Sequence, residues 1–267
     1  IRLSLVGSEM CIRDRFKEEI APIKMSNLCA EIDLPTVPLN DLNDEEGRIA
    51  LCTLSAINWG NIEKPSDFQE LCELAVRGLD ALLSYQNYPV RAAELSTQEY
   101  RPLGIGIINF AYFLAKNGVS YSDPKALALV DEYAEAWSYY LIKASADLAV
   151  EQGPCTKWEN LKYADGRLPI DTRKMEVDEL VPHVERMDWD GLRNQILKTG
   201  IRNATLMALM PAETSAQISN ATNGIEAPRS YVSIKQSKHG VLKQVVPEFE
   251  RLKGAYELLW DQKSPEG

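Results

Sequence analysis

The sequence predicts an α/β fold, in which short apolar strands alternate with longer helices. Two short apolar stretches, 48–55 and 203–210, have the length and composition of buried strands. Between them lie longer segments, including 67–86 and 124–151, in which apolar residues recur at helical spacing. Strands separated by helices in this order are typical of α/β proteins.

Composition and charge describe a globular protein. The chain has 267 residues, 45% of them apolar and 25% charged, enough for one large domain or two small ones. The net charge of −10 argues against a nucleic-acid partner, which favours a basic surface. No apolar run approaches the roughly 18 residues of a membrane span, so no membrane association is expected.

The cysteines favour a reducing, cytoplasmic location. Five are present, an odd number at low density with no CxxC pair, which is unlike a secreted disulfide framework. They are Cys11, Cys29, Cys52, Cys72 and Cys155. The two histidines, His183 and His239, are far apart in sequence, so the spacing predicts no metal site.

The first fifteen residues differ in character from the rest. The apolar patch at 3–6 is too short for a signal peptide. The string 6–15 resembles a translated sequencing adapter. We therefore expect residues 1–15 to lie outside the domain, which then spans 16–267.

Residues 26–31 carry three functional side chains at alternate positions. The segment from Phe16 to Pro38 is interpreted as a loop leading into an extended stretch, because its prolines discourage helix. If 26–31 runs extended, Asn27, Cys29 and Glu31 share one face of the chain. An amide, a thiol and a carboxylate then lie in a row.

The next elements are a strand and a helix. Residues 48–55 predict a buried strand that carries Cys52. Ser66 is the expected N-cap of a helix from Asp67 to Gln86, in which Cys72 is a packed core residue.

The middle of the chain predicts two more helices. The GxG of the apolar run 103–109 is weak as a phosphate motif, and close packing before the helix 110–116 is the simpler interpretation. Gly118 ends that helix, and a long helix follows over 124–151, ended by Gly153. Its aromatic residues are interpreted as core.

The last third predicts a helix at 188–198, a strand at 203–210 and a helix at 216–221. Residues 211–215 between the last two combine a proline, an acid and two hydroxyls, which suits an anion site at a helix start or an ordinary helix cap. Segments 231–234 and 241–246 flank Lys238-His239-Gly240 and predict a hairpin. Pro247 opens a last helix through Trp260.

Two thiols dominate the candidate chemistry. Cys29 has a carboxylate two residues away, and Cys52 lies in a separate apolar segment from which it can reach Cys29. A thiol with a neighbouring base and a second thiol suggests sulfur redox or radical chemistry.

Residues 26–31 together with Cys52 resemble the large, catalytic subunit of class I ribonucleotide reductase. The resemblance continues in the same order through further motifs and covers the chain from Phe16 to about Gln262. These motifs lie at 38–41, 51–55, 103–106, 109–112, 209–215, 217–226 and 231–235.

The resemblance implies a fold and a set of roles. The family's catalytic domain is a ten-stranded α/β barrel, of which this chain would hold an incomplete part. A central finger loop carries the radical cysteine, here Cys29, so 26–31 would be a loop and not a paired strand. A thiyl radical there would abstract the 3′ hydrogen of a ribonucleotide. Glu31 would act as general base, Asn27 would bind the ribose hydroxyls, and Cys52 would be one of two reducing cysteines.

The resemblance also implies a substrate and partners. Ala212, Glu213, Thr214 and Ser215 would hold the diphosphate of a ribonucleoside diphosphate, although the family often has serine at position 212. The chain itself would bind no cofactor. A small metal-containing subunit would supply the radical, thioredoxin or glutaredoxin would be the external reductant, and the full-length large subunit would form a homodimer.

Other parts of the family's machinery would lie outside this sequence. The second redox cysteine and the regulatory region would lie upstream, and the radical-transfer tyrosines and the reducing cysteine tail downstream. We therefore expect this chain to be an internal part of a longer enzyme. Alone, it would lack turnover and would aggregate or fold only partly, because an incomplete barrel exposes strand edges and apolar faces.

Two other functions are compatible with the residues. One is a thiol–disulfide oxidoreductase using Cys29 and Cys52, although such enzymes usually place the two cysteines two residues apart. The other is a non-catalytic nucleotide-binding module, in which residues around Pro211 bind phosphate and the cysteines only pack.

Overall fold

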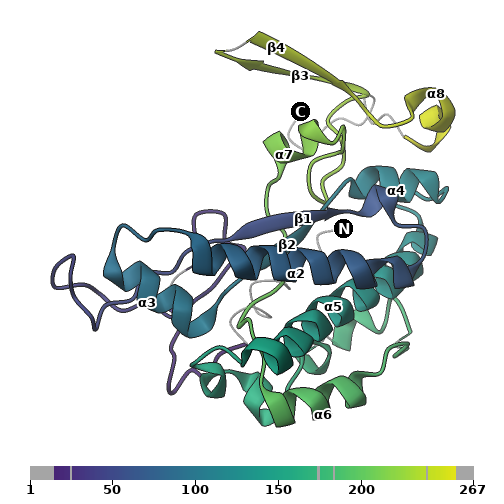
Figure 1. The fold of residues 1–267 in the computed structure, drawn as a ribbon. Coiled ribbons are helices and arrows are strands. Elements are labelled where there is room, and N and C mark those ends of the chain that lie inside the picture. Colours follow the sequence, from purple (N-terminus) through teal and green to yellow (C-terminus); the bar gives the residue numbers. More distant parts are fainter. Residues whose placement is uncertain (1–14, 25, 173–174, 183, 239, 257–267) are drawn as a thin grey trace.

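The computed structural model describes residues 15–256, except 25, 173–174, 183 and 239 (Figure 1). Its helices and strands are β1 (Leu54–Asn58), α2 (Phe68–Tyr85), α3 (Arg91–Tyr100), β2 (Gly104–Ile108), α4 (Phe110–Lys116), α5 (Pro124–Gln152), α6 (Trp189–Thr199), α7 (Glu213–Ile218), β3 (Val232–Ser237), β4 (Gly240–Val245) and α8 (Phe249–Leu252). The predicted α/β class is confirmed.

A small parallel sheet lies at the centre of the body. Strands β1 and β2 pair in parallel, with Leu54 opposite Gly104 and Asn58 opposite Ile108. Beyond β2, Met207 forms a single parallel bridge with Ile105. Three chain segments therefore run side by side in one direction, and helices connect them, as parallel pairing requires.

The helices α2 and α5 pack along one side of these strands (Figure 1), and the core lies between them. Trp59, which follows β1, is fully buried in this core. Its ring centroid lies 5.2 Å from that of Phe68 on α2 and 5.3 Å from that of Phe113 on α4. The expected core roles of Cys72 and Trp137 are confirmed, because both are buried.

Most predicted helices are confirmed within a residue or two at each end, namely α2, α4, α5 and α6. The expected cap at Ser66 is wrong. Asp67 instead accepts hydrogen bonds from the backbone N–H groups of Glu63 and Lys64, which holds the turn before α2. Helix α3 was not predicted at all.

Two predicted strands differ in extent. The strand expected at 48–55 begins only at Leu54, because Arg48 pairs with Val37 and the N–H of Ile49 bonds to Ala92 in α3. The strand expected at 203–210 is reduced to the Met207 bridge. Its first residues bond elsewhere, the N–H of Asn203 to Ser145 and that of Ala204 to Tyr100.

The glycines of the GxG motif serve close packing, as expected. A Cβ atom at Gly106 would lie 2.4 Å from the carbonyl oxygen of Ala208. Only glycine therefore lets the 203–210 segment approach β2 this closely.

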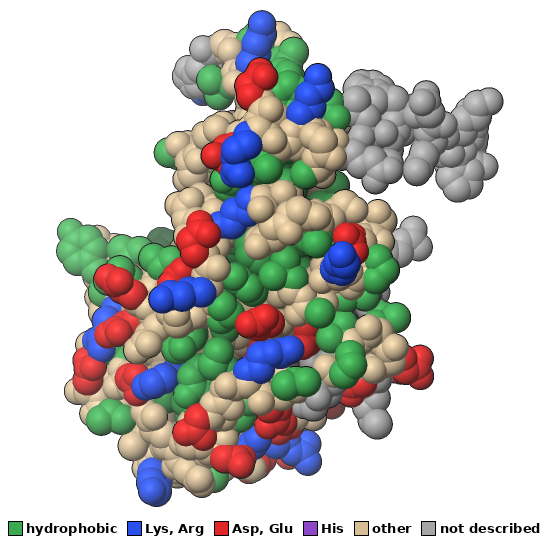
Figure 2. Space-filling view, turned by 90° about the vertical axis from the view of Figure 1, so that its right-hand side faces the viewer, with side chains coloured by type: hydrophobic (Ala, Val, Ile, Leu, Met, Phe, Trp, Pro, Cys, Tyr) green, Lys and Arg blue, Asp and Glu red, His purple; other side chains and the backbone are tan. Residues whose placement is uncertain are grey.

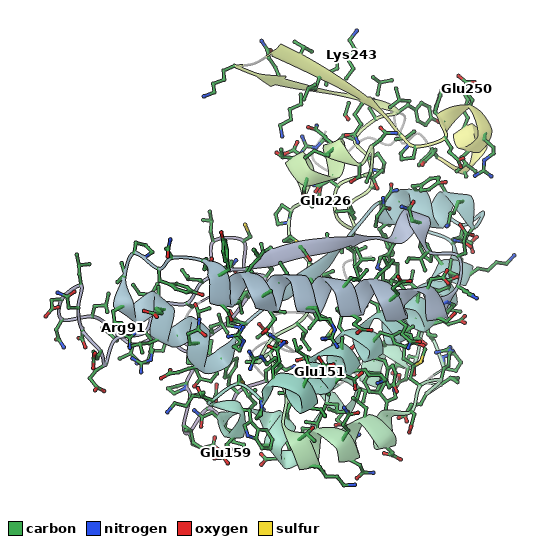
Figure 3. All side chains as sticks on the ribbon, viewed as in Figure 1. Arg91, Glu151, Glu159, Glu226, Lys243 and Glu250 are labelled. Atoms are coloured by element: carbon green, nitrogen blue, oxygen red, sulfur yellow. The ribbon has the colours of Figure 1, made fainter. Side chains whose placement is uncertain are left out.

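The antiparallel hairpin of β3 and β4 projects from the body and is confirmed as predicted (Figure 1). In Figure 3, Lys243 lies on this hairpin, and Glu226 lies in the connection that leads back towards α7. Helix α7 starts at Glu213, three residues earlier than expected. The last helix is only α8 with a short 3-10 turn, Lys253–Ala255.

Some expectations fall on residues outside the described part. These are the terminal segment 1–14 with Cys11, the two histidines, and the end of the last helix at Trp260. Within the described residues, the strands do not close into a barrel.

Candidate active site

Residues 26–33 form a tight turn. Ser26 and Asp33 form an antiparallel bridge, and the N–H of Asn27 bonds to the carbonyl oxygen of Ile32. Ala30 has a φ of 56°, the left-handed conformation that lets the chain reverse. The extended conformation first expected for 26–31 is therefore wrong, because Asn27 and Glu31 approach each other across a turn and not along one face of a strand.

Asn27 organises this turn through all four hydrogen bonds that its amide can make. Its Oδ1 accepts the backbone N–H groups of Glu31 at 3.0 Å and Ile32 at 3.1 Å. Its Nδ2 donates to Oε1 of Glu31 at 2.7 Å and to Sγ of Cys52 at 3.0 Å. The two accepted bonds fix which end of the amide faces the carboxylate and the thiol.

Cys52 reaches the turn from a separate part of the chain. It follows the bridge between Val37 and Arg48 and precedes β1. A cavity of about 630 Å³ lies between residues 24–39 and residues 48–52. It is lined mostly by apolar residues, and Asn27 and Cys52 lie on its wall. Burial is the largest influence on Cys52 and raises the pKa of its thiol, against the lowering effect of the Asn27 hydrogen bond.

Glu31 combines burial with an unused hydrogen-bonding atom. Its side chain is only 4% exposed, and while Oε1 accepts from Asn27, Oε2 has no partner. A buried carboxylate oxygen without a partner is costly unless a donor is supplied from outside. The arrangement suits a base that receives a hydroxyl group of a bound molecule.

Cys29 is exposed at the turn, and its neighbour Leu28 projects fully into solvent. Hydrogen bonds join Asn27 to Glu31 and to Cys52, and Cys29 lies on the same turn, two residues from Asn27 and two from Glu31. The structure thus brings Asn27, Glu31 and Cys52 together and places Cys29 on the turn between Asn27 and Glu31.

The second predicted site lies at the start of α7. Ala212 is buried, whereas Glu213, Thr214 and Ser215 are exposed. The hydroxyl of Thr214 accepts a hydrogen bond from Lys235 on β3 at 2.9 Å, and that of Ser215 donates to the carbonyl oxygen of Ala212. Both hydroxyls are therefore at the surface, near a cation.

Two residues of this second site were not predicted. Asn223 accepts the backbone N–H of Ala212 through Oδ1 at 2.8 Å, and Lys235 holds Thr214. Asn223 lies within the motif at 217–226, but nothing in that motif indicated its partner, because Ala212 lies eleven residues earlier.

No metal centre or membrane helix emerges from the described residues. Within them, no three His, Cys, Asp or Glu side chains are grouped as a metal ion would require. Among the described helices, none combines the length and apolar character that a membrane crossing needs.

Comparison with known proteins shows the family of this chain. The family model of the ribonucleotide reductase barrel domain matches residues 10–262. The chain belongs to this family. It is 58% identical over 252 residues to the ribonucleoside-diphosphate reductase subunit alpha of Haemophilus influenzae. The corresponding figures are 57% over 252 residues for ribonucleoside-diphosphate reductase 1 subunit alpha of Escherichia coli and 55% over 250 for subunit alpha of Buchnera aphidicola.

These ribonucleotide reductase subunits are longer than this chain. Each alignment covers 94% of the chain but 33% of the relative. The chain thus spans about a third of the length of the relatives it matches.

Proposed function

We propose that this chain is part of the catalytic subunit of a ribonucleoside-diphosphate reductase. The carrying observation is the position of Asn27, whose Nδ2 joins the carboxylate of Glu31 to the thiol of Cys52 while the other oxygen of Glu31 stays free. Family membership and the names of the relatives support the same activity.

In the proposed reaction a thiyl radical on Cys29 takes the hydrogen atom from C3′ of the ribose. Glu31 accepts the proton of the 3′ hydroxyl through its free oxygen, and water leaves from C2′. Cys52 and a second cysteine, which is not in this cluster, then reduce the sugar and become a disulfide, and Cys29 returns the hydrogen atom to C3′. The raised pKa of Cys52 keeps its thiol neutral, as hydrogen-atom transfer requires.

Substrate binding completes the proposal. Thr214, Ser215 and the first backbone N–H groups of α7 would hold the diphosphate, with Ala212 and Glu213 shaping the turn. The exposed positions of Thr214 and Ser215 and the ammonium of Lys235 beside Thr214 support this role.

The partners follow from the same proposal. A small metal-containing subunit would supply the radical, and thioredoxin or glutaredoxin would reduce the disulfide. The longer large subunit would form a homodimer. We also infer that the complete domain is a ten-stranded α/β barrel with residues 26–33 as its central finger loop. The parallel β1–β2 pair and the tight turn support that fold.

The Cys29→Ser variant tests the function in the full-length reductase assembled with its radical-generating subunit. We expect formation of deoxyribonucleoside diphosphate to fall to background, because serine cannot carry the radical, while the affinity for ribonucleoside diphosphate is kept. Cys72→Ser is the matched control, because that buried thiol has no role in the proposed reaction.

The same variant separates the other candidate functions. Unchanged product formation with Cys29→Ser would favour a nucleotide-binding module. Reduction of insulin disulfides by the wild-type chain, lost in Cys29→Ser, would favour a thiol–disulfide oxidoreductase.

A further inference from the structure

The geometry points to Gly104 as a positioning residue that sets the placement of the Asn27–Glu31 turn relative to the Cys52 thiol. This inference rests on the proposed function of that cluster. Gly104 is the first residue of β2 and touches neither Glu31 nor Cys52 through a side chain, since it has none. It nevertheless contacts the residue next to each of them.

The first contact of Gly104 is with the chain segment that carries Cys52. The backbone N–H of Gly104 donates to the carbonyl oxygen of Thr53 at 2.9 Å. Thr53 follows Cys52 directly, and the backbone groups of Ala50, Leu51 and Cys52 form no hydrogen bond within the described part of the chain. The Thr53 bond is therefore the nearest backbone anchor of Cys52 to the sheet.

The second contact of Gly104 is with Ile32 in the turn at residues 26–33. A Cβ atom at Gly104 would lie 2.5 Å from Cδ2 of Leu54, 2.9 Å from Cβ of Ala208 and 3.0 Å from Cδ1 of Ile32, which is 4% exposed. The absent side chain thus leaves a seat that Ile32 shares with Leu54 and Ala208. A side chain at position 104 would fill this seat, because contacts this close are tighter than normal packing allows.

Two backbone hydrogen-bonding groups of Ile32 couple its position to that of Asn27. Its backbone N–H donates to Oδ1 of Asn27 at 3.1 Å, and its carbonyl oxygen accepts the N–H of Asn27 at 3.1 Å. Asn27 in turn bonds to Glu31 and Cys52. Gly104 therefore contacts both segments of the cluster. Its missing side chain leaves room for Ile32 of the turn, and its backbone N–H bonds to Thr53 beside Cys52.

Two variants disturb the seat in opposite ways. Gly104→Ala adds a methyl group where Ile32 packs, and Ile32→Ala removes the side chain that fills the seat. Either change should let the turn move away from Cys52. Burial, the Asn27 hydrogen bond and the neighbouring Glu31 all act on the pKa of this exposed thiol, so its titration should shift away from the wild-type position.

The measurement is the pH dependence of iodoacetamide alkylation of Cys52. It uses the full-length reductase, reduced beforehand and without its radical-generating subunit, with peptide masses separating Cys52 from the other cysteines. We expect the half-maximal rate to shift by about 0.5 pH unit or more in both variants. In steady-state assays, kcat should fall while the KM for the diphosphate substrate is kept.

Three further variants serve as controls. Ile23→Ala truncates another buried side chain of the segment before the turn, which does not line the cavity beside Cys52, and should leave the Cys52 profile unchanged. Gly106→Ala should disturb Ala208 and Met210, which its Cβ would meet, but not the turn. Ile32→Val removes only the Cδ1 atom that faces Gly104 and should shift the Cys52 profile in the same direction as Ile32→Ala, but by less.

The inference is overturned if folded Gly104→Ala and Ile32→Ala show the wild-type Cys52 profile, or if Ile23→Ala shifts it equally. If Gly104→Ala fails to fold, Ile32→Ala and Ile32→Val still decide. Alkylation needs no turnover, so a wild-type enzyme without reductase activity would refute the proposed function but leave this test valid.

Discussion

At the scale of single residues, Asn27 is the residue on which the candidate site depends. Its amide is fully used inside the protein, with two bonds accepted and two donated. To bind a ribose hydroxyl, as the resemblance implies, it must exchange the bond to Cys52 or to Glu31. Substrate binding and the environment of the thiol are therefore coupled through one side chain.

The Asn27→Ala variant should loosen the turn locally. The N–H groups of Glu31 and Ile32 lose their acceptor, and removal of one such bond is worth about 1 kcal/mol. Hydrogen exchange of these two amides should speed up by roughly fivefold or more. Ser26→Ala, which alters an exposed neighbour, should leave both rates unchanged, and equal rates in Asn27→Ala would contradict the role.

At the scale of elements, one buried carboxylate ties a connecting segment to α5. Glu135 accepts the backbone N–H groups of Arg186 and Met187 and the indole N–H of Trp189. Burial alone would raise the pKa of Glu135. The bonds from Arg186 and Trp189 outweigh it, and the pKa lies below its ordinary value of 4.5.

This shift predicts a stability that is lost in acid. A carboxylate whose pKa is lowered by folding stabilises the folded state above the unfolded pKa, and the contribution disappears as pH falls through the folded value. Hydrogen exchange in 184–189 should therefore accelerate below about pH 4.5. In Glu135→Gln it should be fast already at pH 7, while Glu132→Gln should match the wild type. Slow exchange in Glu135→Gln at pH 7 would exclude this account.

At the scale of the whole molecule, a buried charge network joins four parts of the chain. Asp80 on α2 accepts from Arg101 at 2.7 Å, Asn203 at 3.0 Å and Arg202 at 3.3 Å. Asn203 also accepts from Ser145 on α5. The side chains of Asp80 and Arg101 are 3% and 5% exposed, so the network belongs to the interior and holds the 202–205 segment against the helices.

Removal of the Asp80 carboxylate should strongly destabilise the folded state. Asp80→Ala leaves the buried guanidinium of Arg101 and the partly buried one of Arg202 without their counter-charge, which costs about 3–5 kcal/mol. Amide exchange throughout α2 and α5 should accelerate by more than a hundredfold. Glu73→Ala breaks the exposed pair with Arg77 and should change little, because such pairs contribute about 0–1 kcal/mol. An equal effect of both variants would refute the distinction.

The surface of the molecule predicts how the chain behaves by itself. On the face in Figure 2, acidic and basic side chains are interspersed, with hydrophobic side chains gathered between them. Leu74 on α2, Ile234 on β3 and Leu242 on β4 are each more than half exposed. We expect the isolated chain to self-associate, seen as light scattering and elution ahead of a monomer. A soluble monomer with a sharp melting transition would contradict this expectation.

The sequence by itself determined α2, α4, α5, α6, the hairpin and the identity of the candidate residues. Periodicity over 124–151 and glycines at helix ends are local signals, so α5 and its neighbours could be predicted from them. The functional groups of Asn27, Cys29, Glu31 and Cys52 could be named from residue type and resemblance for the same reason.

Only the tertiary structure decided how these groups meet. Alternation along 26–31 favoured an extended strand, but the bonds of Asn27 to two backbone N–H groups stabilise a turn instead. The start of β1 and the loss of the 203–210 strand depend on partners far away in sequence, as does the Ile32 seat at Gly104. Hydrogen bonds and packing between distant segments leave no local pattern, so the sequence names the candidate groups while the fold sets their distances.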